Sequence, residues 1–502
     1  MSIADVVRAT AARSPAKEAV IFQGRATTYA ELDQQIDAAA AGIAALGIRK
    51  GDRVAVLIHN VPQFIVAYLG IVRGGGVMVA MNTLYTPDEV SFILADSEAR
   101  AVIVSEPFTA TVEGMRETLP MLEHVVVCAD QAPMGAMSWE QMVGRGEGAP
   151  EVAPTDDDLA CIGYTSGTTG TPKGAMLTHG NLTANLDQMN QVPALAEVES
   201  DVVLLVLPLF HIYALNVILG LTMRAGATAV LHERFDPVAS LDAVEKHDVT
   251  ILFGAPPMFV AWLSVPGLEQ RDLSSVRLAV SGAAPLAAQV MQDFERRTGI
   301  TIWEGYGLTE TAPGVCSNAM GQVAKPGSIG KPLPGVEVRL VDEDGDDVED
   351  GDPGEIVVKG PNVFAGYWRQ DAATKEAMRD GWFHTGDVAY QDDEGYLFIV
   401  DRKKDLIIVS GFNVYPREVE ETLYRHPKIA DAAVVGIEHP YTGEAVKAIV
   451  VLKPGEQASE GDILEFCSRS LARFKCPQVV EFADEIPHNI TGKVLRHRLR
   501  DR

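Results

Sequence analysis

The first third of the chain alternates between helical and strand-like patterns of apolar residues. Apolar side chains recur at helical spacing over residues 32–46, behind Thr28 and Glu31, which have the spacing of a capping box. A continuous apolar run at residues 53–58 predicts a buried strand, and a second helical pattern covers residues 61–72. Shorter runs predict further strands at residues 76–80, 101–104 and 125–128. This alternation is typical of an α/β domain with layered, largely parallel sheets.

A second stretch of the same character covers residues 159–333, and the pattern then changes. Apolar strands at residues 336–341 and 355–359 flank an acidic run, which predicts antiparallel pairing around a solvated turn. Near the C-terminus the patterns predict a compact α+β module, with helices at 416–424 and 462–472 and strands at 432–437 and 445–452.

We therefore predict an α/β protein with two domains of unequal size. The large N-terminal domain, residues 1–401, combines layered α/β subdomains with a β-rich subdomain, and the small α+β domain is residues 402–502. The charged run Asp401-Arg-Lys-Lys-Asp405 supplies an exposed joint between them.

Charge, apolar runs and cysteines indicate which classes of protein the chain can belong to. The 502 residues include 69 acidic and 42 basic side chains, a net charge of −27, which disfavours a nucleic-acid partner. Neither a signal-peptide pattern nor an uncharged apolar run long enough to span a membrane is evident, so we expect no transmembrane segment. The five cysteines form no CxxC pair and predict reduced thiols in a cytoplasmic protein.

The strongest chemical signal is the loop Tyr164-Thr-Ser-Gly-Thr-Thr-Gly-Thr-Pro-Lys-Gly174. Its backbone N–H groups and hydroxyls can surround a polyphosphate, although the spacing is not that of a Walker A loop. A flexible linker would need neither the Pro-Lys-Gly ending nor the apolar strands on either side. The predicted phosphate-binding residues are Thr165, Ser166, Gly167, Thr168, Thr169, Gly170 and Lys173.

With this loop the chain resembles the acyl-adenylate-forming enzymes, which include acyl-CoA synthetases, luciferases and the adenylation domains of peptide synthetases. The resemblance covers essentially the whole chain, and the residues of its motifs are most similar to those of bacterial medium- and long-chain fatty acid–CoA ligases. Six more motifs follow in the order of that family: Pro208-Leu-Phe-His211, Ser281-Gly-Ala-Ala-Pro285, Tyr306-Gly-Leu-Thr-Glu310, Thr385-Gly-Asp387, Asp401-Arg-Lys-Lys404 and Thr491-Gly-Lys493.

The motif Tyr306-Gly-Leu-Thr-Glu310 suits a nucleotide site. The glycines on either side of Tyr306 remove side chains where something flat must pass, Thr309 offers a hydroxyl to the α-phosphate, and Glu310 offers a hard oxygen to Mg²⁺. By resemblance, the adenine ring is held by Tyr306 and by the Ser281–Pro285 turn with Gly282, Ala283 and Ala284, and Gly307 also belongs to the ATP site. Asp387 can accept hydrogen bonds from both ribose hydroxyls, and the resemblance adds Arg402 as its helper.

Lys493 is the leading predicted catalytic residue, beside Thr309, Glu310 and His211. A lysine at the α-phosphorus would stabilise the negative charge that develops when a carboxylate attacks it, and no general base is needed because the carboxylate is already ionised. The resemblance implies two reactions in two domain arrangements, with the small domain rotating about Lys404. Ser410 and Gly411 would then line a channel for the thiol of CoA.

The acyl pocket is predicted to be apolar. Adenylation domains that select amino acids carry an aspartate where this chain has His211, which argues against an amino-acid substrate. The resemblance implies that His211 is a gate beside the carboxylate site. The run Ile212-Tyr-Ala-Leu-Asn-Val-Ile-Leu219 suits an alkyl chain. Tyr213, Asn216 and Gly305 are the predicted pocket residues, although Tyr213 or Asn216 could equally floor a shorter or aromatic pocket.

Three interpretations follow from the sequence. The first is a fatty acyl-CoA synthetase that uses ATP, Mg²⁺ and CoA. The second is a ligase that loads an acyl carrier protein, which the family builds with an extra segment that is not evident between Thr385 and Arg417. The third, a non-catalytic binding protein, predicts loss of Lys493, Glu310 or Asp387, and all three are present. An aryl or short-chain acid and a homodimer are left open.

Overall fold

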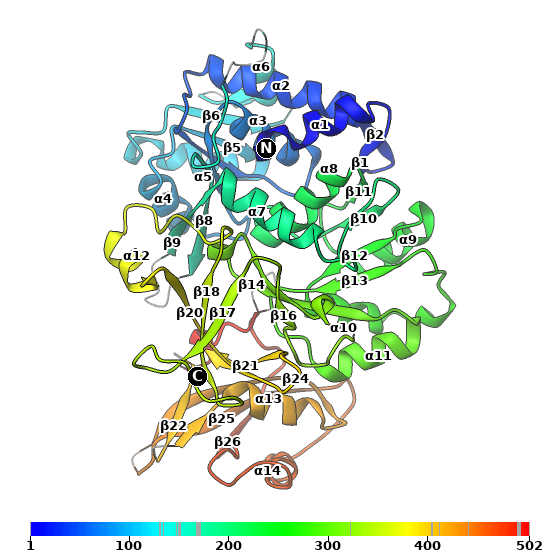
Figure 1. Cartoon of the computed structure of the whole chain (residues 1–502), viewed down its shortest axis with the longest axis vertical. Helices are drawn as coiled ribbons and strands as arrows, with labels where there is room; N and C mark the ends of the chain where they lie inside the picture. The colour runs from blue at the N-terminus through cyan, green and yellow to red at the C-terminus, as the bar shows by residue number, and fades with distance from the viewer. Residues whose placement is uncertain are drawn as a thin grey trace.

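Four β-sheets organise the part of the chain that the computed structural model describes (Figure 1). The described residues are 2–129, 132–133, 135–146, 148, 152–166, 172–321, 323–402, 405–410, 412–439, 441–488 and 493–500. Three of the sheets belong to a large N-terminal domain and the fourth to a small C-terminal domain, as the sequence predicts.

A seven-stranded sheet forms the N-terminal layer among the described residues. Its pairs are parallel except for the last, the β8–β9 hairpin, which carries the predicted phosphate loop at its tip. In spatial order the strands are β7 (Met137–Ser138), β6 (His124–Cys128), β5 (Ala101–Ser105), β3 (Arg53–Leu57), β4 (Val77–Ala80), β8 (Leu159–Ser166) and β9 (Pro172–Thr178).

A nine-stranded sheet lies beside the first one within the same described region. Its central strands are parallel, and β1, from the start of the chain, joins them next to β11. In spatial order the strands are β16 (Lys331–Pro332), β15 (Gly314–Ser317), β14 (Ile302–Gly307), β13 (Leu278–Ser281), β12 (Ile251–Gly254), β10 (Val202–Leu205), β11 (Thr228–Leu231), β1 (Glu18–Phe22) and β2 (Arg25–Thr28).

The β-rich part of the large domain is an antiparallel sheet. The acidic run 342–347 turns at the start of the connection between its first two strands, which pair antiparallel as predicted. The strands are β17 (Glu337–Val341), β18 (Gly354–Lys359), β20 (Trp382–Gln391), β19 (Met378–Arg379) and β21 (Leu397–Arg402).

The small domain is a fourth sheet covered by helices. Its strands are β23 (Phe412–Val414), β22 (Ile407–Val409), β25 (Gly443–Leu452), β24 (Ile429–His439) and β26 (Val479–Phe482). Strand β21 ends at Arg402 and β22 begins at Ile407, so four residues of the sequence separate the last strand of the large domain from the first strand of the small domain. The boundary between residues 401 and 402 stays a prediction.

Helices cover the faces of the sheets (Figure 1). The α-helices are α1 (Val6–Arg13), α2 (Tyr29–Ala45), α3 (Pro62–Arg73), α4 (Pro87–Asp96), α5 (Thr109–Met115), α6 (Trp139–Val143), α7 (His179–Asn190), α8 (Leu221–Ala225), α9 (Pro237–His247), α10 (Pro256–Leu263), α11 (Ala288–Thr298), α12 (Asp371–Ala377), α13 (Pro416–Tyr424), α14 (Glu460–Ser468) and α15 (His497–Arg500). The shorter turns are η1 (Ile3–Asp5), η2 (Glu106–Phe108), η3 (Arg116–Thr118), η5 (Leu268–Gln270), η6 (Thr309–Thr311) and η7 (Asn318–Met320), and a π-helix, η4, covers Tyr213–Gly220.

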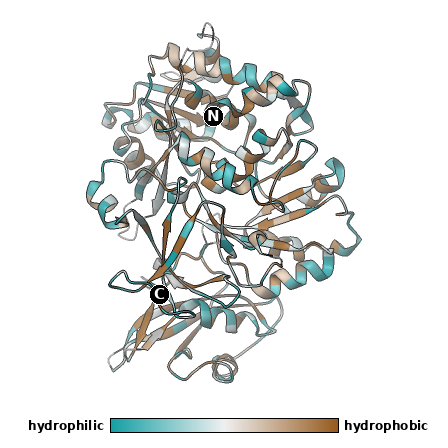
Figure 2. Ribbon diagram, in the orientation of Figure 1, coloured by the Kyte–Doolittle hydropathy of each residue, from teal (hydrophilic) through white to brown (hydrophobic). Residues whose placement is uncertain are grey.

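The apolar pattern explains these elements. Thr28 caps α2 through the predicted capping box with Glu31, and the apolar stripe behind it is buried. Strands β3, β4 and β5 are almost entirely buried and are apolar except for Arg53 at the start of β3 and Ser105 at the end of β5, which suits parallel strands between helices. Figure 2 shows the apolar colour concentrated on many of the strands, whereas the helices carry hydrophilic and apolar colours side by side.

Two expectations from composition can be compared with the structure. The five cysteines, Cys128, Cys161, Cys316, Cys467 and Cys476, are all free thiols. In the described ranges, the helices are too short or too polar for any of them to cross a membrane.

Candidate active site

Tyr306 and Asp387 meet where the nine-stranded sheet and the β-rich sheet come together. Tyr306 lies near the carboxyl end of β14, and Asp387 lies in the middle of β20. The phenol of Tyr306 donates a hydrogen bond of 2.7 Å to Oδ2 of Asp387, which is buried. The predicted adenine ring partner and the predicted ribose ligand therefore belong to one site, at the strand ends where open α/β sheets bind ligands.

Two glycines allow backbone segments to approach each other closely beside this pair. A Cβ atom on Gly307 would lie 1.9 Å from the carbonyl oxygen of Pro313, so only glycine fits where the chain folds back after β14. A Cβ atom on Gly163 of β8 would lie 2.7 Å from the methyl group of Thr309. The motif with Thr309 is thus packed directly on the hairpin that carries the phosphate loop.

Glu310 lies in η6 with its side chain largely buried, at 7% exposure. Its Oε1 accepts a hydrogen bond of 2.9 Å from the phenol of Tyr367, and its carbonyl accepts one of 2.8 Å from the N–H of Phe364. The segment 360–369 therefore holds both the backbone and the side chain of the predicted magnesium ligand. The sequence reasoning missed Tyr367, which belongs to none of the seven motifs.

Four buried carboxamides form a cage around the turn at residues 311–314. Asn362 donates to the carbonyls of Thr311 (2.8 Å) and Gly314 (3.0 Å), and Asn216 donates to the carbonyl of Ala312 (2.7 Å). The other two members, Asn185 and Gln188, extend this cage. Asn185 bonds to both backbone groups of Gly314 and to Gln188, and Gln188 donates to Oδ1 of Asn362 (3.2 Å). The cage fixes the turn that follows Glu310.

Asn216 thus has a structural role beside the one predicted from the sequence. Its side chain is fully buried, and its amide nitrogen is occupied by the carbonyls of Ala312 and Leu182 (3.1 Å). A place in the acyl pocket stays a prediction for this residue.

The phosphate loop is described at its two ends. Thr165 lies on β8 opposite Lys173 on β9, and both side chains are half-buried. The ammonium of Lys173 lies 5.3 Å from the centre of the Tyr367 ring, within cation–π range. Ser166 ends β8, with its side chain outside the description, and the predicted residues Gly167, Thr168, Thr169 and Gly170 lie outside the described residues.

The predicted adenine turn follows β13. Ala283 is exposed and has a φ of +70°, a left-handed conformation that costs energy for a residue with a side chain. Ala284 is half-buried beside it. A Cβ atom on Gly282 would come within 3.0 Å of the ring of Tyr213, so Tyr213 lies directly under this turn. There is open space beside Gly305, because a Cβ atom added there would lie no closer than 3.6 Å to any neighbouring atom.

A buried acid that the sequence reasoning missed supports the same turn. Glu304 of β14 accepts a hydrogen bond of 3.3 Å from the N–H of Leu286. Burial raises the pKa of Glu304 to about 7, against the opposing effect of Arg417 in the small domain. The sequence offered one signal for Glu304, which is that it directly precedes Gly305 and Tyr306 of the nucleotide motif.

His211 begins the apolar wall of the predicted acyl pocket. Its Nδ1 accepts a hydrogen bond of 3.3 Å from the N–H of Tyr213, so the neutral ring carries its proton on Nε2. Burial lowers the pKa of His211 to about 4. The π-helix that follows is a rare geometry, frequent at functional sites. The hydroxyl of Tyr213 donates to the carbonyl of Val280 at 3.4 Å.

The small domain contacts the large domain through α13. Arg417 donates to the carbonyls of Ile399 (3.0 Å) and Gly327 (3.4 Å), both in the large domain. Lys493 is half-buried just before Val494, which forms a bridge with His488. Ser410 has a φ of +53° at the end of β22. Lys404, Gly411 and the side chain of Arg402 lie outside the described residues.

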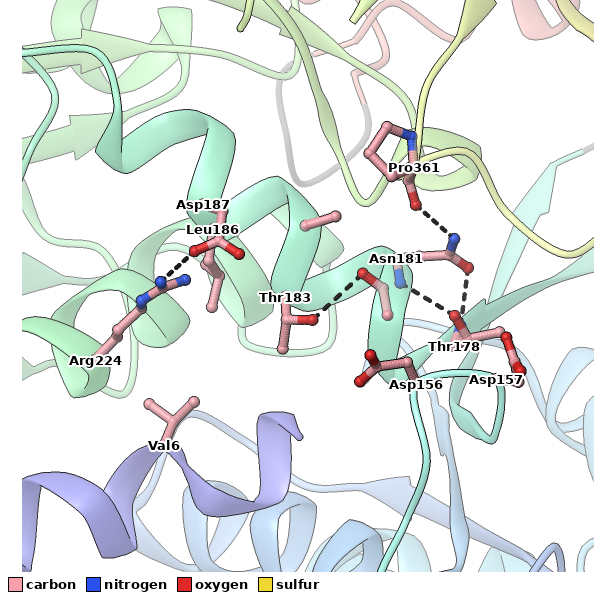
Figure 3. Close-up of a pocket in the computed structure, with 12 residues that line it drawn as sticks. Val6, Asp156, Asp157, Thr178, Asn181, Thr183, Leu186, Asp187, Arg224 and Pro361 are labelled. Carbon is pink, nitrogen blue, oxygen red and sulfur yellow. Dashed lines mark hydrogen bonds and ion pairs between the residues drawn. The ribbon is translucent and has the colours of Figure 1, made fainter. Parts of the chain in front are cut away.

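A cavity of about 460 Å³ lies beside α7 (Figure 3). It is bordered by Asn181, which donates to the carbonyl of Pro361 (2.9 Å), and by the ion pair of Arg224 and Asp187. Among the described residues, none of the predicted site residues lines it, so we do not assign it to the reaction.

Comparison with known proteins agrees with this geometry. The sequence profile described as AMP-binding enzyme matches residues 7–368, and the profile of the AMP-binding enzyme C-terminal domain matches residues 418–493. The chain belongs to the AMP-binding enzyme family. It is 38% identical to a long-chain-fatty-acid–CoA ligase of Escherichia coli O6:H1, over 100% of this chain and 94% of the relative.

Other members of the family extend the comparison. A feruloyl-CoA synthase of an Amycolatopsis species is 40% identical over 97% of this chain and 96% of the relative. The ATP-bound structure of MatB from Rhodopseudomonas palustris matches with a TM-score of 0.92 at 35% identity, covering 100% of this chain and 99% of MatB. Apo MatB, with the same coverage, gives 0.80, so the fold described above is closer to the ATP-bound form.

Proposed function

We propose that this AMP-forming acid–thiol ligase is an ATP-dependent acyl-CoA synthetase that activates a medium- or long-chain fatty acid. The acid and ATP form acyl-AMP and pyrophosphate, and the thiol of CoA then attacks the acyl-AMP to give acyl-CoA and AMP. The observation that carries this proposal is the 2.7 Å hydrogen bond between Tyr306 and Asp387, which unites the predicted adenine and ribose sites. Membership of the AMP-binding enzyme family over both profiles supports it.

In the first reaction an oxygen of the ionised fatty acid attacks the α-phosphorus, and the bond to pyrophosphate breaks. Lys173 and the hydroxyls of its loop bind the leaving phosphates, and Thr309 contacts the α-phosphate. Lys493 stabilises the charge that builds up on the α-phosphate in the transition state. Asp387, with Arg402, orients the ribose, so the reactants meet in line.

Glu310 is the proposed ligand for Mg²⁺. A site with one buried carboxylate suits this ion, which commonly binds one or two carboxylates together with substrate phosphates and waters. When bound, Mg²⁺ would neutralise charge on the phosphates. The largely buried carboxylate of Glu310, held by Tyr367, provides the hard oxygen donor that such a site needs.

In the second reaction the sulfur of CoA attacks the acyl carbonyl carbon and loses its thiol proton to water, and AMP leaves with the electrons of the broken carbon–oxygen bond. We propose that rotation of the small domain about Lys404 removes Lys493 from the site and brings Ser410 and Gly411 to the thiol path. The left-handed φ of Ser410 indicates a tight turn of the backbone at that position.

The acyl chain is proposed to lie against Tyr213, Gly305 and the π-helix, behind His211. An apolar wall suits an alkyl chain, because burial of each CH₂ contributes about 0.8 kcal/mol. The similarity to a feruloyl-CoA synthase favours an aryl acid as the second candidate. A carrier protein in place of CoA is the third candidate. A cytoplasmic location is a prediction from the sequence, and the oligomeric state is left open.

The test is pyrophosphate release with MgATP and acids from acetate to palmitate, together with benzoate and ferulate, each with and without CoA. We expect turnover that requires CoA and is greatest for an alkyl acid of medium or long chain. A maximum with ferulate or benzoate would favour the aryl ligase. Release of acyl-AMP without thioester for every acid would favour loading of a carrier protein.

A further inference from the structure

The segment 360–369 connects β18 to α12 and passes under the proposed adenylation site. Its backbone is bonded to both sides of that site. The N–H of Phe364 donates to Glu310 (2.8 Å), and the N–H of Trp368 donates to Gly174 (2.7 Å), next to Lys173. Backbone bonds between this segment and Met176 in both directions, at 2.9 Å, complete the attachment.

Tyr367 is held in place within this segment. Its N–H donates to Oγ1 of Thr374 (2.9 Å), and its ring packs edge-on against Phe364 at 4.9 Å. The neighbouring residue Trp368 donates its indole N–H to the carbonyl of Asp96 (3.0 Å). The Tyr367 side chain therefore projects from a backbone that is fixed on both sides.

This side chain contacts two functional groups of opposite charge. The hydroxyl donates 2.9 Å to Oε1 of Glu310, and the ring face lies 5.3 Å from the ammonium of Lys173. Lys173 comes from the hairpin of one sheet, whereas Glu310 follows a strand of another. Because both contacts come from one rigid ring, they fix the position of the phosphate-loop lysine relative to the proposed magnesium ligand.

We propose that Tyr367 is a positioning residue for adenylation, which holds Glu310 for Mg²⁺ and Lys173 for the phosphates. This inference rests on the proposed function. The hydroxyl and the ring have separate tasks: the hydroxyl orients the carboxylate, and the ring orients the ammonium. The two tasks can be separated, because phenylalanine keeps the ring and loses the hydroxyl, whereas leucine loses both.

The experiment measures equilibrium binding of ATP by titration calorimetry, once with EDTA and once with Mg²⁺, on the full chain. For Tyr367→Phe we expect unchanged binding of ATP in EDTA and a gain from Mg²⁺ that is at least five-fold smaller than in the wild type. For Tyr367→Leu we expect weaker binding in both conditions. Tyr390→Phe is the matched control, because Tyr390 is exposed and stacks on Phe398, and it should bind ATP as the wild type does.

A second measurement guards against loss of folding. In a Glu310→Gln background, Tyr367→Phe should cause no further loss of the Mg²⁺-dependent gain, because the carboxylate it orients is already removed. Equal Mg²⁺-dependent gains in the wild type and Tyr367→Phe, or additive losses in the double variant, would overturn the proposal. A wild type that neither binds MgATP nor releases pyrophosphate would overturn the proposed function instead.

Discussion

The phenol of Tyr306 and the carboxylate of Asp387 are hydrogen-bonded at 2.7 Å, although 81 residues separate them in the chain. The bond gives Asp387 a fixed orientation before any nucleotide arrives. Since Asp387 is the proposed ribose ligand, the orientation of its second oxygen depends on the tyrosine hydroxyl as well as on β20. Preorganisation of this kind lowers the entropic cost of binding.

Removal of that hydroxyl should weaken nucleotide binding and leave the chemistry largely intact. For Tyr306→Phe we expect the KM for ATP to rise about five- to ten-fold, which corresponds to the loss of one hydrogen bond worth about 1 kcal/mol or slightly more. The kcat should change less than two-fold by rough estimate, because the ring and Lys493 are retained. Steady-state kinetics with varied ATP tests this, and a large fall in kcat at unchanged KM would contradict it.

Asn362 should matter for stability as well as for activity. Asn362→Ala removes the donor to two buried carbonyls and leaves both without that partner, so we expect a loss of about 2–4 kcal/mol in the free energy of unfolding. Binding of MgATP should weaken too, because the turn after Glu310 loses its support. Urea denaturation checks the stability. Asn190→Ala, an exposed asparagine at the end of α7, should be nearly neutral.

Glu304 predicts a defined dependence of stability on pH. Its pKa is raised from an ordinary value of 4.5 to about 7 by burial, so the folded state favours the protonated acid. Below the unfolded pKa both states are protonated. As pH rises from there to about 7 the unfolded state gains the charge first, and the wild type loses about 3 kcal/mol.

The variant Glu304→Gln has no acid at this position and should not show that loss. We expect the difference in unfolding free energy between variant and wild type to grow in favour of the variant between roughly pH 4.5 and 8. Denaturation curves at several pH values test this. Parallel pH profiles for the two proteins would mean that Glu304 is not held protonated.

Lys493 and Gly411 should divide the two half-reactions between them. Lys493→Ala should reduce pyrophosphate release by about a hundred-fold or more, since a charge at the transition state is removed, and spare thioester formation from supplied acyl-AMP. Gly411→Leu should show the reverse pattern, because a side chain would obstruct the thiol path. Assays of each half-reaction separate them, and an equal loss of both in either variant would contradict the assignment.

His211 should contribute no titration near neutral pH. With its pKa lowered to about 4, the ring is neutral across the ordinary assay range. We therefore expect the KM for the fatty acid to depend on pH in the same way in His211→Asn and in the wild type between roughly pH 6 and 8. A wild-type inflection near pH 6.5 that the variant lacks would show a charged gate.

The sequence was informative where chemistry or periodicity leaves a local pattern. The helix at 416–424 coincides with α13 (Pro416–Tyr424), because its apolar stripe has helical spacing. The family resemblance assigns Tyr306 and Asp387 to one nucleotide site, and the structure joins them by a hydrogen bond. The helical stripe and each individual motif lie within about ten consecutive residues, and for that reason the sequence alone reveals them.

Contacts between distant segments leave no such pattern. Asn216 reads as one polar residue in an apolar run, and only the fold brings it to the carbonyl of Ala312, 96 residues further on. Asn362 and Tyr367 lie in an ordinary loop sequence, and their partners come from distant segments of the chain. These residues support the site through long-range hydrogen bonds, which hydrophobic periodicity does not encode.

The carboxamide cage of Asn185, Gln188, Asn216 and Asn362 has one more consequence. Each turnover brings a highly charged nucleotide into the site and then releases pyrophosphate, so the local electric field changes sharply within every cycle. Amide side chains neither titrate nor attract counterions, and their hydrogen bonds respond little to salt. The carboxamide cage behind Glu310 therefore responds little to the charges that enter and leave the site, and we expect it to have the same conformation for each new substrate.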